Sequence, residues 1–147
     1  MADPGAAAIR EARPADADEL ARLSTQLGYP VPSPVARERL AAIAGHADHA
    51  LFVATSPTGL AGWLQVSLPR IFESPPCAEI AGLVVDEARR GAGIGAALAA
   101  AAADWARGKG CRALRVRTNV IRERALRFYE REGFARVKVQ NVLEKAL

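Results

Sequence analysis

Apolar residues recur every three to four positions in the first third of the chain, which is the spacing of one face of an amphipathic helix. Leu20, Leu23 and Leu27 lie on one such face, and Gly28 ends the pattern. Pro34, a residue type favoured at the first position of a helix, opens a second stretch. These patterns predict helices over residues 14–27 and 34–43.

Shorter apolar runs bounded by turn residues predict strands. The segment Ser56-Pro-Thr-Gly59 joins two of them into a hairpin. The run from Ile80 to Val85 is apolar throughout, as in a strand buried on both faces, and Gly82 within it indicates a bulge or a close backbone approach. The predicted strands cover residues 7–11, 50–55, 60–68, 77–86 and 113–118, with one or two further strands over residues 134–143.

Two more helices are predicted in the second half. One starts after a glycine-rich segment and ends near Gly108, and the other covers residues 122–131 and is capped by Gly133. The element order is therefore mixed α/β, with an antiparallel hairpin first and a strand–helix–strand unit later. Because neither a repeat nor a linker interrupts the pattern, we expect residues 1–147 to form a single domain.

The composition indicates in which cellular compartment the protein works. No run of 18 apolar residues is present, so the sequence predicts no membrane span, and the first twenty residues lack the basic and apolar regions of a signal peptide. Cys77 and Cys111 form no CxxC pair and no cluster with histidine. We therefore expect a reduced, cytoplasmic protein.

The net charge of +4 is divided unevenly along the chain. Residues 1–88 hold 6 lysines and arginines against 11 aspartates and glutamates, a charge of −5, whereas residues 89–147 hold 14 against 5, a charge of +9. The basic part suits an anionic cofactor, a membrane surface or nucleic acid, although solvated arginines on helix faces give the same imbalance. Because the arginines lack interleaved aromatic residues or a known motif, nucleic-acid binding is the least favoured class.

The glycine-rich segment Asp86-Glu-Ala-Arg-Arg-Gly-Ala-Gly-Ile-Gly-Ala96 joins the buried strand to the following helix. A helix N-terminus presents unpaired N–H groups and a partial positive charge, and glycines let a ligand approach the backbone. With Arg89 and Arg90 beside it, this loop suits a diphosphate. A tight turn without a ligand remains the alternative.

Two other phosphate-binding loops suit the segment less well. A Walker A loop needs Gly-Lys-Ser/Thr, which is absent. A dinucleotide-binding loop is a closer rival, since residues 91–96 satisfy GxGxx(G/A), but that fold needs an acidic residue at the end of the next strand. The predicted strand over residues 113–118 has none.

Two motifs resemble one enzyme family. Arg90-Gly-Ala-Gly-Ile-Gly95 matches the (Gln/Arg)-x-x-Gly-x-(Gly/Ala) motif of the GNAT superfamily of N-acetyltransferases, and Tyr129-Glu-Arg-Glu-Gly-Phe134 matches its Tyr-x-x-x-Gly-Phe segment. The resemblance is strongest over residues 77–138, while residues 8–68 follow only the family's element order. It implies an α/β fold with a mixed central sheet of six or seven strands, splayed at its centre and flanked by four helices.

The resemblance also implies the chemistry and the binding residues. Acetyl-CoA would be the cosubstrate, no metal would be needed, and the acetyl group would pass to a primary amine by direct attack in a ternary complex. The acceptor pocket would be built largely from the first helices and the loops at residues 29–34 and 69–76. The implied acetyl-CoA-binding residues are Leu83, Val84 and Val85 for the pantetheine arm, Arg90, Gly91, Ala92, Gly93, Ile94 and Gly95 for the pyrophosphate, and Asn119 and Tyr129.

Two positions near the residues expected to contact the pantetheine arm depart from the family's pattern. Many members carry Asn three residues before the alanine of the last helix, where this chain has Arg122, and Asn119 lies further back. Leu126 also replaces a histidine that one version of the family carries.

Glu79 is the candidate general base. It is the only acid between Glu73 and Asp86, and it lies eleven positions before Arg90, as the general-base glutamate does in some family members. An edge carboxylate that is exposed to water or paired with an arginine is the alternative. The backbone N–H of Val85 would stabilise the oxyanion.

Tyr129 is the candidate general acid, because a phenol is protonated at neutral pH and can donate its proton to the leaving thiolate. Packing in the core is the alternative. His46 and His49 lack further ligands with metal-site spacing, so we expect no metal.

As partners we expect a small-molecule or peptide amine, with a cationic acceptor favoured by the −5 charge of residues 1–88, and neither nucleic acid nor membrane. A homodimer is left open. The competing functions are a non-catalytic acetyl-CoA-binding sensor and an acyltransferase acting on a peptide N-terminus.

Overall fold

The computed structural model describes residues 7–147. Within it the chain forms two compact units, one ending at Arg117 and the other beginning at Thr118. Each unit is described by itself below.

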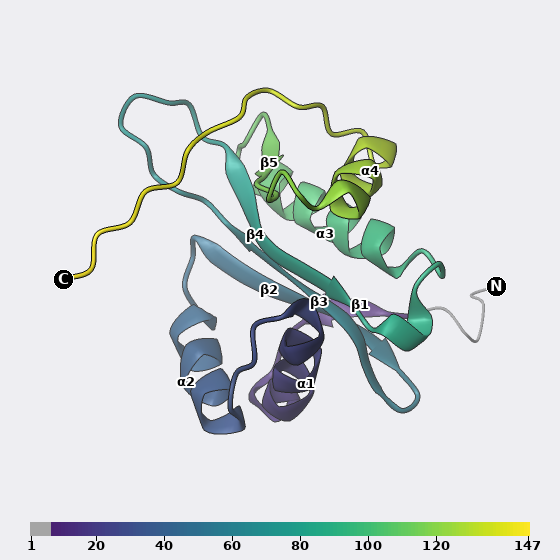
Figure 1. The fold of residues 1–147 in the computed structure, drawn as a ribbon. Helices are drawn as coiled ribbons and strands as arrows, with labels where there is room; N and C mark the ends of the chain where they lie inside the picture. Colours follow the sequence, from purple (N-terminus) through teal and green to yellow (C-terminus); the bar gives the residue numbers. More distant parts are fainter. Residues whose placement is uncertain (1–6) are drawn as a thin grey trace. The chain divides into compact units, whose positions relative to one another are not determined.

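The first unit is built on one mixed sheet with the strand order β1-β2-β3-β4-β5 (Figure 1). The first four strands pair antiparallel, and β5 pairs parallel with β4. The glycine-ended turn between β2 and β3 closes the predicted hairpin, with Ser56 opposite Gly59. The strands are β1 (Ile9–Glu11), β2 (His49–Ser56), β3 (Gly59–Ser67), β4 (Ala78–Val85) and β5 (Leu114–Val116).

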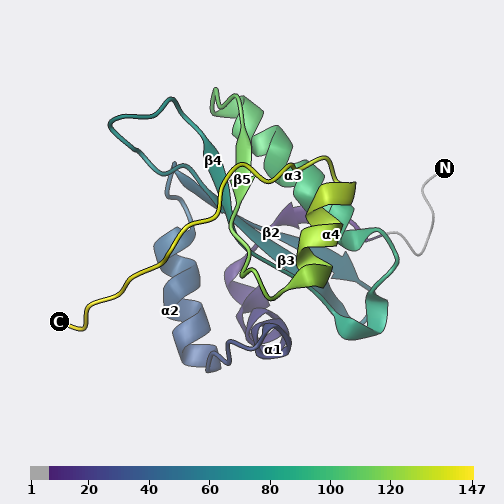
Figure 2. The same cartoon turned by 45° about the horizontal axis from the view of Figure 1, so that its top comes forward.

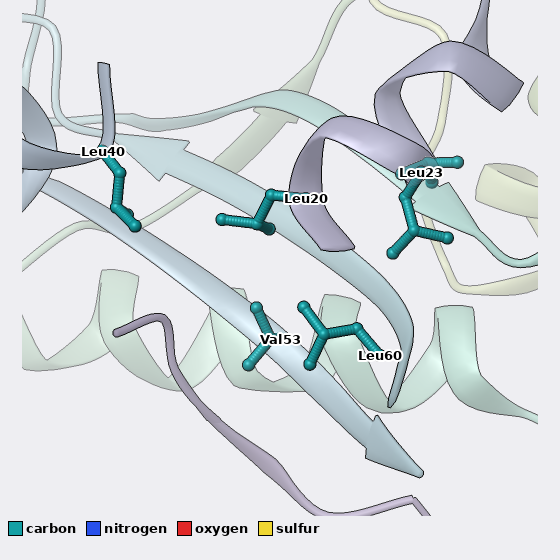
Figure 3. Packing of buried hydrophobic residues seen from close by; sticks show 6 residues of the cluster. Leu20, Leu23, Leu40, Val53 and Leu60 are labelled. Atoms are coloured by element: carbon teal, nitrogen blue, oxygen red, sulfur yellow. The ribbon is translucent and has the colours of Figure 1, made fainter. Parts of the chain in front are cut away.

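Helices cover both faces of this sheet. Figures 1 and 2 show α1 (Ala17–Leu27) and α2 (Ser33–Ile43) side by side on one face, with α3 (Ile94–Gly108) on the other. The predicted leucine face of α1 is confirmed, since Leu20 and Leu23 are buried and Leu27 packs against the same core cluster. Figure 3 shows Leu20 and Leu23 of α1 and Leu40 of α2 on the same side of the sheet, facing Val53 and Leu60.

Gly82 lies at an irregularity in β4, as the sequence predicts. Gln65 of β3 pairs with Gly82, but the next residue, Val66, pairs with Ile80, so Ala81 is an extra residue and forms a bulge. A Cβ atom on Gly82 would lie 3.0 Å from the ring of Trp63. A side chain at this position would press on the indole, which packs directly on the backbone of Gly82.

The second unit contains α4 (Glu123–Arg131), the fourth helix of the described chain. Gly133 ends it with a φ of +94°, which confirms the predicted cap. The prediction of one or two strands over residues 134–143 is wrong: this segment has no regular secondary structure, so the sheet has five strands instead of six or seven. The segment has the alternating valines of a strand, Val137 and Val139, but both are exposed and no described strand pairs with it.

Candidate functional site

The edge of β4 that faces β5 is unpaired in its second half. Pairing between β4 and β5 ends at Ile80 and Val116, five residues before β4 itself ends. The N–H of Asp86 donates to Ala61 on the β3 side, and backbone groups alternate in direction along a strand. The N–H groups of Leu83 and Val85 therefore point to the side that β5 leaves open. This is the splay that the sequence analysis expects at the pantetheine-binding residues.

The glycine-rich loop follows directly. Gly91 and Gly93 have φ values of +85° and +78°, the left-handed region that favours glycine, and neither has another atom within 4 Å of the place of a Cβ. Gly93 is the N-cap of α3, so the backbone N–H groups of Ile94, Gly95 and Ala96 lie in the first turn. Arg90, Gly91 and Ala92 are exposed. The loop thus presents a helix N-terminus and open backbone, which is the geometry of an anion site.

A polar network fixes the start of this loop to α1. Asp86 accepts hydrogen bonds from the backbone N–H of Ala88 at 3.1 Å and from Arg22 at 3.1 Å, and Gln26 accepts one from the N–H of Glu87 at 2.9 Å. The N–H of Ala88, and then the side chains of Gln26 and Arg22, hold the pKa of Asp86 below its ordinary value against the opposing effect of burial. The carboxylate therefore stays charged and keeps the loop attached to α1 at neutral pH.

Glu79 lies on the face of β4 that α1 and α2 cover. Its neighbours Ala78 and Ile80 are buried towards the opposite face. Its Oε1 accepts a hydrogen bond from Nε of Arg117 at 2.6 Å, and the side chain keeps 21% of its exposure. The structure thus contains the arginine-paired carboxylate that the sequence analysis gives as the alternative, at a position that stays accessible.

The second unit holds the two remaining predicted residues. Tyr129 is buried on α4, and its ring contacts those of Phe128 and Phe134, whose centroids are 5.0 and 5.4 Å away. Burial raises the pKa of Tyr129 to about 12. The phenol is therefore protonated at neutral pH, although the aromatic contacts are also those of a packing residue. Oδ1 of Asn119 accepts a hydrogen bond from the N–H of Ile121, which turns its side chain towards its own backbone.

Two cavities open in the first unit. One, of about 390 Å³, lies between α1, α2 and strands β2 to β4 and includes Tyr29 and Val31 among its lining residues. The other, of about 310 Å³, is lined by residues of the loop at 69–76, by Glu79 and by three arginines near β5. Both predicted acceptor loops thus line a cavity.

Sequence analysis missed two residues of the larger cavity, Arg39 and Trp63. No local motif marks either residue, because the cavity brings together segments between residues 20 and 82. The only available signal was Gly82, which indicated a close approach without naming Trp63 as its partner.

Metal ligands are not gathered in the described chain. Residues 7–147 contain no group of three or more His, Cys, Asp and Glu side chains placed to hold a metal ion. His46 and His49 stack edge to face with centroids 4.6 Å apart. None of the helices within these residues has the length and apolar character that a bilayer crossing requires.

Comparison with known proteins agrees with this geometry. The model of the Acetyltransferase (GNAT) family matches residues 16–134. The aminoglycoside N(6')-acetyltransferase type 1 of Stenotrophomonas maltophilia is 35% identical over 111 residues, which cover 72% of this chain and 71% of that protein.

Solved structures share the fold. A transcriptional regulator from Bacillus halodurans superposes with a TM-score of 0.83 at 26% identity, over 95% of this chain and 99% of that one. The aminoglycoside N-acetyltransferase AAC(6')-Iy in complex with CoA superposes with a TM-score of 0.87 at 20% identity, over 100% and 99% of the two chains. The family match spans most of the chain and includes the open edge of β4 and the glycine loop. The chain therefore belongs to the GNAT acetyltransferase family and is an acetyl-CoA-dependent N-acetyltransferase.

Proposed function

We propose that this protein transfers the acetyl group of acetyl-CoA to the primary amine of a small molecule, by direct attack in a ternary complex. The observation that carries the proposal is the open edge of β4 at Leu83–Val85, which leads directly into the glycine loop at the N-terminus of α3. The pantetheine arm would pair with that edge while the pyrophosphate lies on the loop, with Asn119 and Tyr129 completing the cofactor site.

In this mechanism the amine nitrogen attacks the thioester carbonyl carbon and the C–S bond then breaks. The N–H of Val85, which points to the open side of β4, would donate to the oxyanion. Glu79 would accept the amine proton, with Arg117 holding its carboxylate in place. Tyr129 would donate a proton to the CoA thiolate. Each proton removed or delivered thus has a named side chain.

Two of the three proteins named above are aminoglycoside N-acetyltransferases, which supports a small-molecule amine as the acceptor class. The family match crosses the junction between the two units at residue 117, which supports the proposal that both work as one domain. We also propose a cytoplasmic location, which the two free cysteines support.

The test is release of CoA thiol from acetyl-CoA with a panel of primary amines, combined with calorimetry of acetyl-CoA binding. We expect binding in the absence of acceptor and thiol release only with an amine. Acetyl-CoA binding without thiol release on any amine would favour the sensor alternative. Activity confined to peptides with a free N-terminus would favour the peptide alternative.

A further inference from the structure

The larger cavity is apolar and bounded by the first two helices. Its wall is formed mainly by aliphatic side chains of α1, α2 and the loop between them, and it closes against the sheet at Leu51, Trp63 and Gly82. Its volume of about 390 Å³ lies at the small end of the range for ligand pockets. An occupant with a compact apolar body would bury its surface here.

Besides Arg39 and Trp63, the polar side chains of this cavity are Ser24, Tyr29 and Gln65, which can donate and accept hydrogen bonds. None of its described lining residues is acidic, and Arg39 is the only charged one. Arg39 is exposed at the cavity, and within residues 7–147 it forms no ion pair. Nε1 of Trp63 is buried and has no hydrogen-bond partner among the described residues. The guanidinium of Arg39 is suited to a carboxylate of a bound molecule and does not suit a second ammonium group.

The acidic residues behind the −5 charge lie elsewhere. Within the described chain, six of the carboxylates between residues 7 and 88 are already paired with arginines, and none of these six lines the larger cavity. In the smaller cavity the only acid is Glu79, which Arg117 holds at 2.6 Å. The six are Asp16, Asp18, Glu19, Asp48, Glu79 and Asp86. The regional charge therefore does not make a binding site for a polycation.

We propose that the acceptor is a small primary amine with an apolar body and one carboxylate group, bound in the larger cavity with its carboxylate at Arg39. This inference rests on the proposed function and specifies its acceptor. It replaces the cationic acceptor that the charge of residues 1–88 suggested, because no acidic side chain lines the larger cavity. The apolar body would lie against the leucines of α1 and α2 and beside Trp63.

The experiment compares acetylation of L-phenylalanine, 2-phenylethylamine and neamine by the full chain. The first two share a ring and an amine and differ by the carboxylate, whereas neamine is a polycation without an apolar ring. We expect kcat/KM to be about tenfold higher for phenylalanine than for 2-phenylethylamine, the effect of one charge-assisted hydrogen bond, and lowest for neamine.

Variants of α2 test the role of Arg39. In Arg39→Met the phenylalanine to 2-phenylethylamine ratio should fall to about one, and in Arg39→Glu below one. Arg37→Met is the matched control, since Arg37 is exposed on the same helix, pairs with Asp18 and does not line the cavity, so the ratio should not change.

The outcomes separate this inference from the proposed function. Neamine as the best acceptor, or an unchanged ratio in Arg39→Met, would overturn the inference and leave the amine acetyltransferase intact. Acetyl-CoA binding with no turnover of any of the three amines, or of the wider panel, would overturn the proposed function together with the inference.

Discussion

The sites proposed for the two substrates lie in different parts of the chain and consist of different kinds of group. The donor side is a continuous stretch, from the end of β4 through the glycine loop into α3, and it offers mostly backbone N–H groups. The acceptor-side cavity is assembled from α1, α2, β2, β3 and β4, and it offers side chains. Backbone donors are available whatever the local side chains are, whereas a cavity changes with each residue that lines it. One fold can therefore keep its cofactor and change its acceptor.

Gly93→Asp is the change with the largest expected effect on the donor side. It places a β-carbon at a left-handed position and a negative charge at the N-terminus of α3, where the pyrophosphate would lie. We expect calorimetry to show acetyl-CoA affinity lowered by more than about a hundredfold in a folded protein.

Gly110→Asp is its control, because Gly110 has a similar φ of +80° in open space but lies beyond the C-terminal end of α3. It should carry the same backbone strain and bind acetyl-CoA normally. Equal affinities for the two variants would contradict a donor site in the loop.

Glu79→Gln tests the chemistry that the two sides share. If Glu79 accepts the amine proton, kcat should fall by about a hundredfold, because the amide cannot act as a base, while acetyl-CoA affinity stays the same. Steady-state thiol release across the pH range measures this. Glu73→Gln, in the exposed loop before β4, should have no effect. A turnover of Glu79→Gln within twofold of wild type would assign deprotonation to water or another group.

Tyr129→Phe should have a smaller effect on the same step. It keeps the ring and its contacts with Phe128 and Phe134 but removes the hydroxyl. Because a thiolate is already a good leaving group, we expect kcat to fall only about tenfold with CoA binding unchanged. Full kcat in Tyr129→Phe, with lower thermal stability in Tyr129→Ala, would make Tyr129 a packing residue.

The pKa of Tyr129 also predicts a pH dependence of stability. Between pH 10 and 12 the unfolded tyrosine ionises while the buried phenol, with its pKa of about 12, stays protonated. Stability should therefore fall with rising pH in that window, and less so in Tyr129→Phe. Urea unfolding of both proteins at pH 9 and 11 would measure the difference.

Gly82→Ala should give the smallest effect and separate the two sides most cleanly. The added methyl would lie 3.0 Å from the ring of Trp63 and push it towards the cavity. We expect the acceptor KM to rise about threefold while the acetyl-CoA Kd is unchanged, since this corresponds to less than about 1 kcal/mol. Gly108→Ala, with no atom near the new methyl, is the control. A weaker acetyl-CoA affinity in Gly82→Ala would mean that the two sites are coupled through β4.

The same contrast explains which features could be predicted from the sequence. The glycine loop is a local motif between a strand and a helix, so its place followed from the residues alone, and the leucine face of α1 followed from its spacing. The pairing of Glu79 with Arg117 joins residues 38 positions apart, so from the sequence, pairing with an arginine was only an alternative and its partner could not be named. Residues 134–143 have a strand pattern, but a strand also needs a partner, and in the described chain none pairs with them. Long-range partners are what local patterns leave undetermined.

The bulge at Ala81 determines which side chains of β4 share a face of the sheet. Side chains alternate between the two faces of a strand, so in a regular strand of the same residues Glu79, Leu83 and Val85 would point to the same face. With the bulge, Glu79 shares the α1 face with Val84, which joins the core cluster there, and Ile80 shares the other face with Leu83 and Val85. The backbone directions shift by the same step, so the N–H groups that meet the open edge are those of Leu83 and Val85. A regular β4 that kept Ala81 would exchange the residues on its two faces, whereas deleting Ala81 would remove the bulge and leave Glu79 and Val84 on one face and Ile80, Leu83 and Val85 on the other.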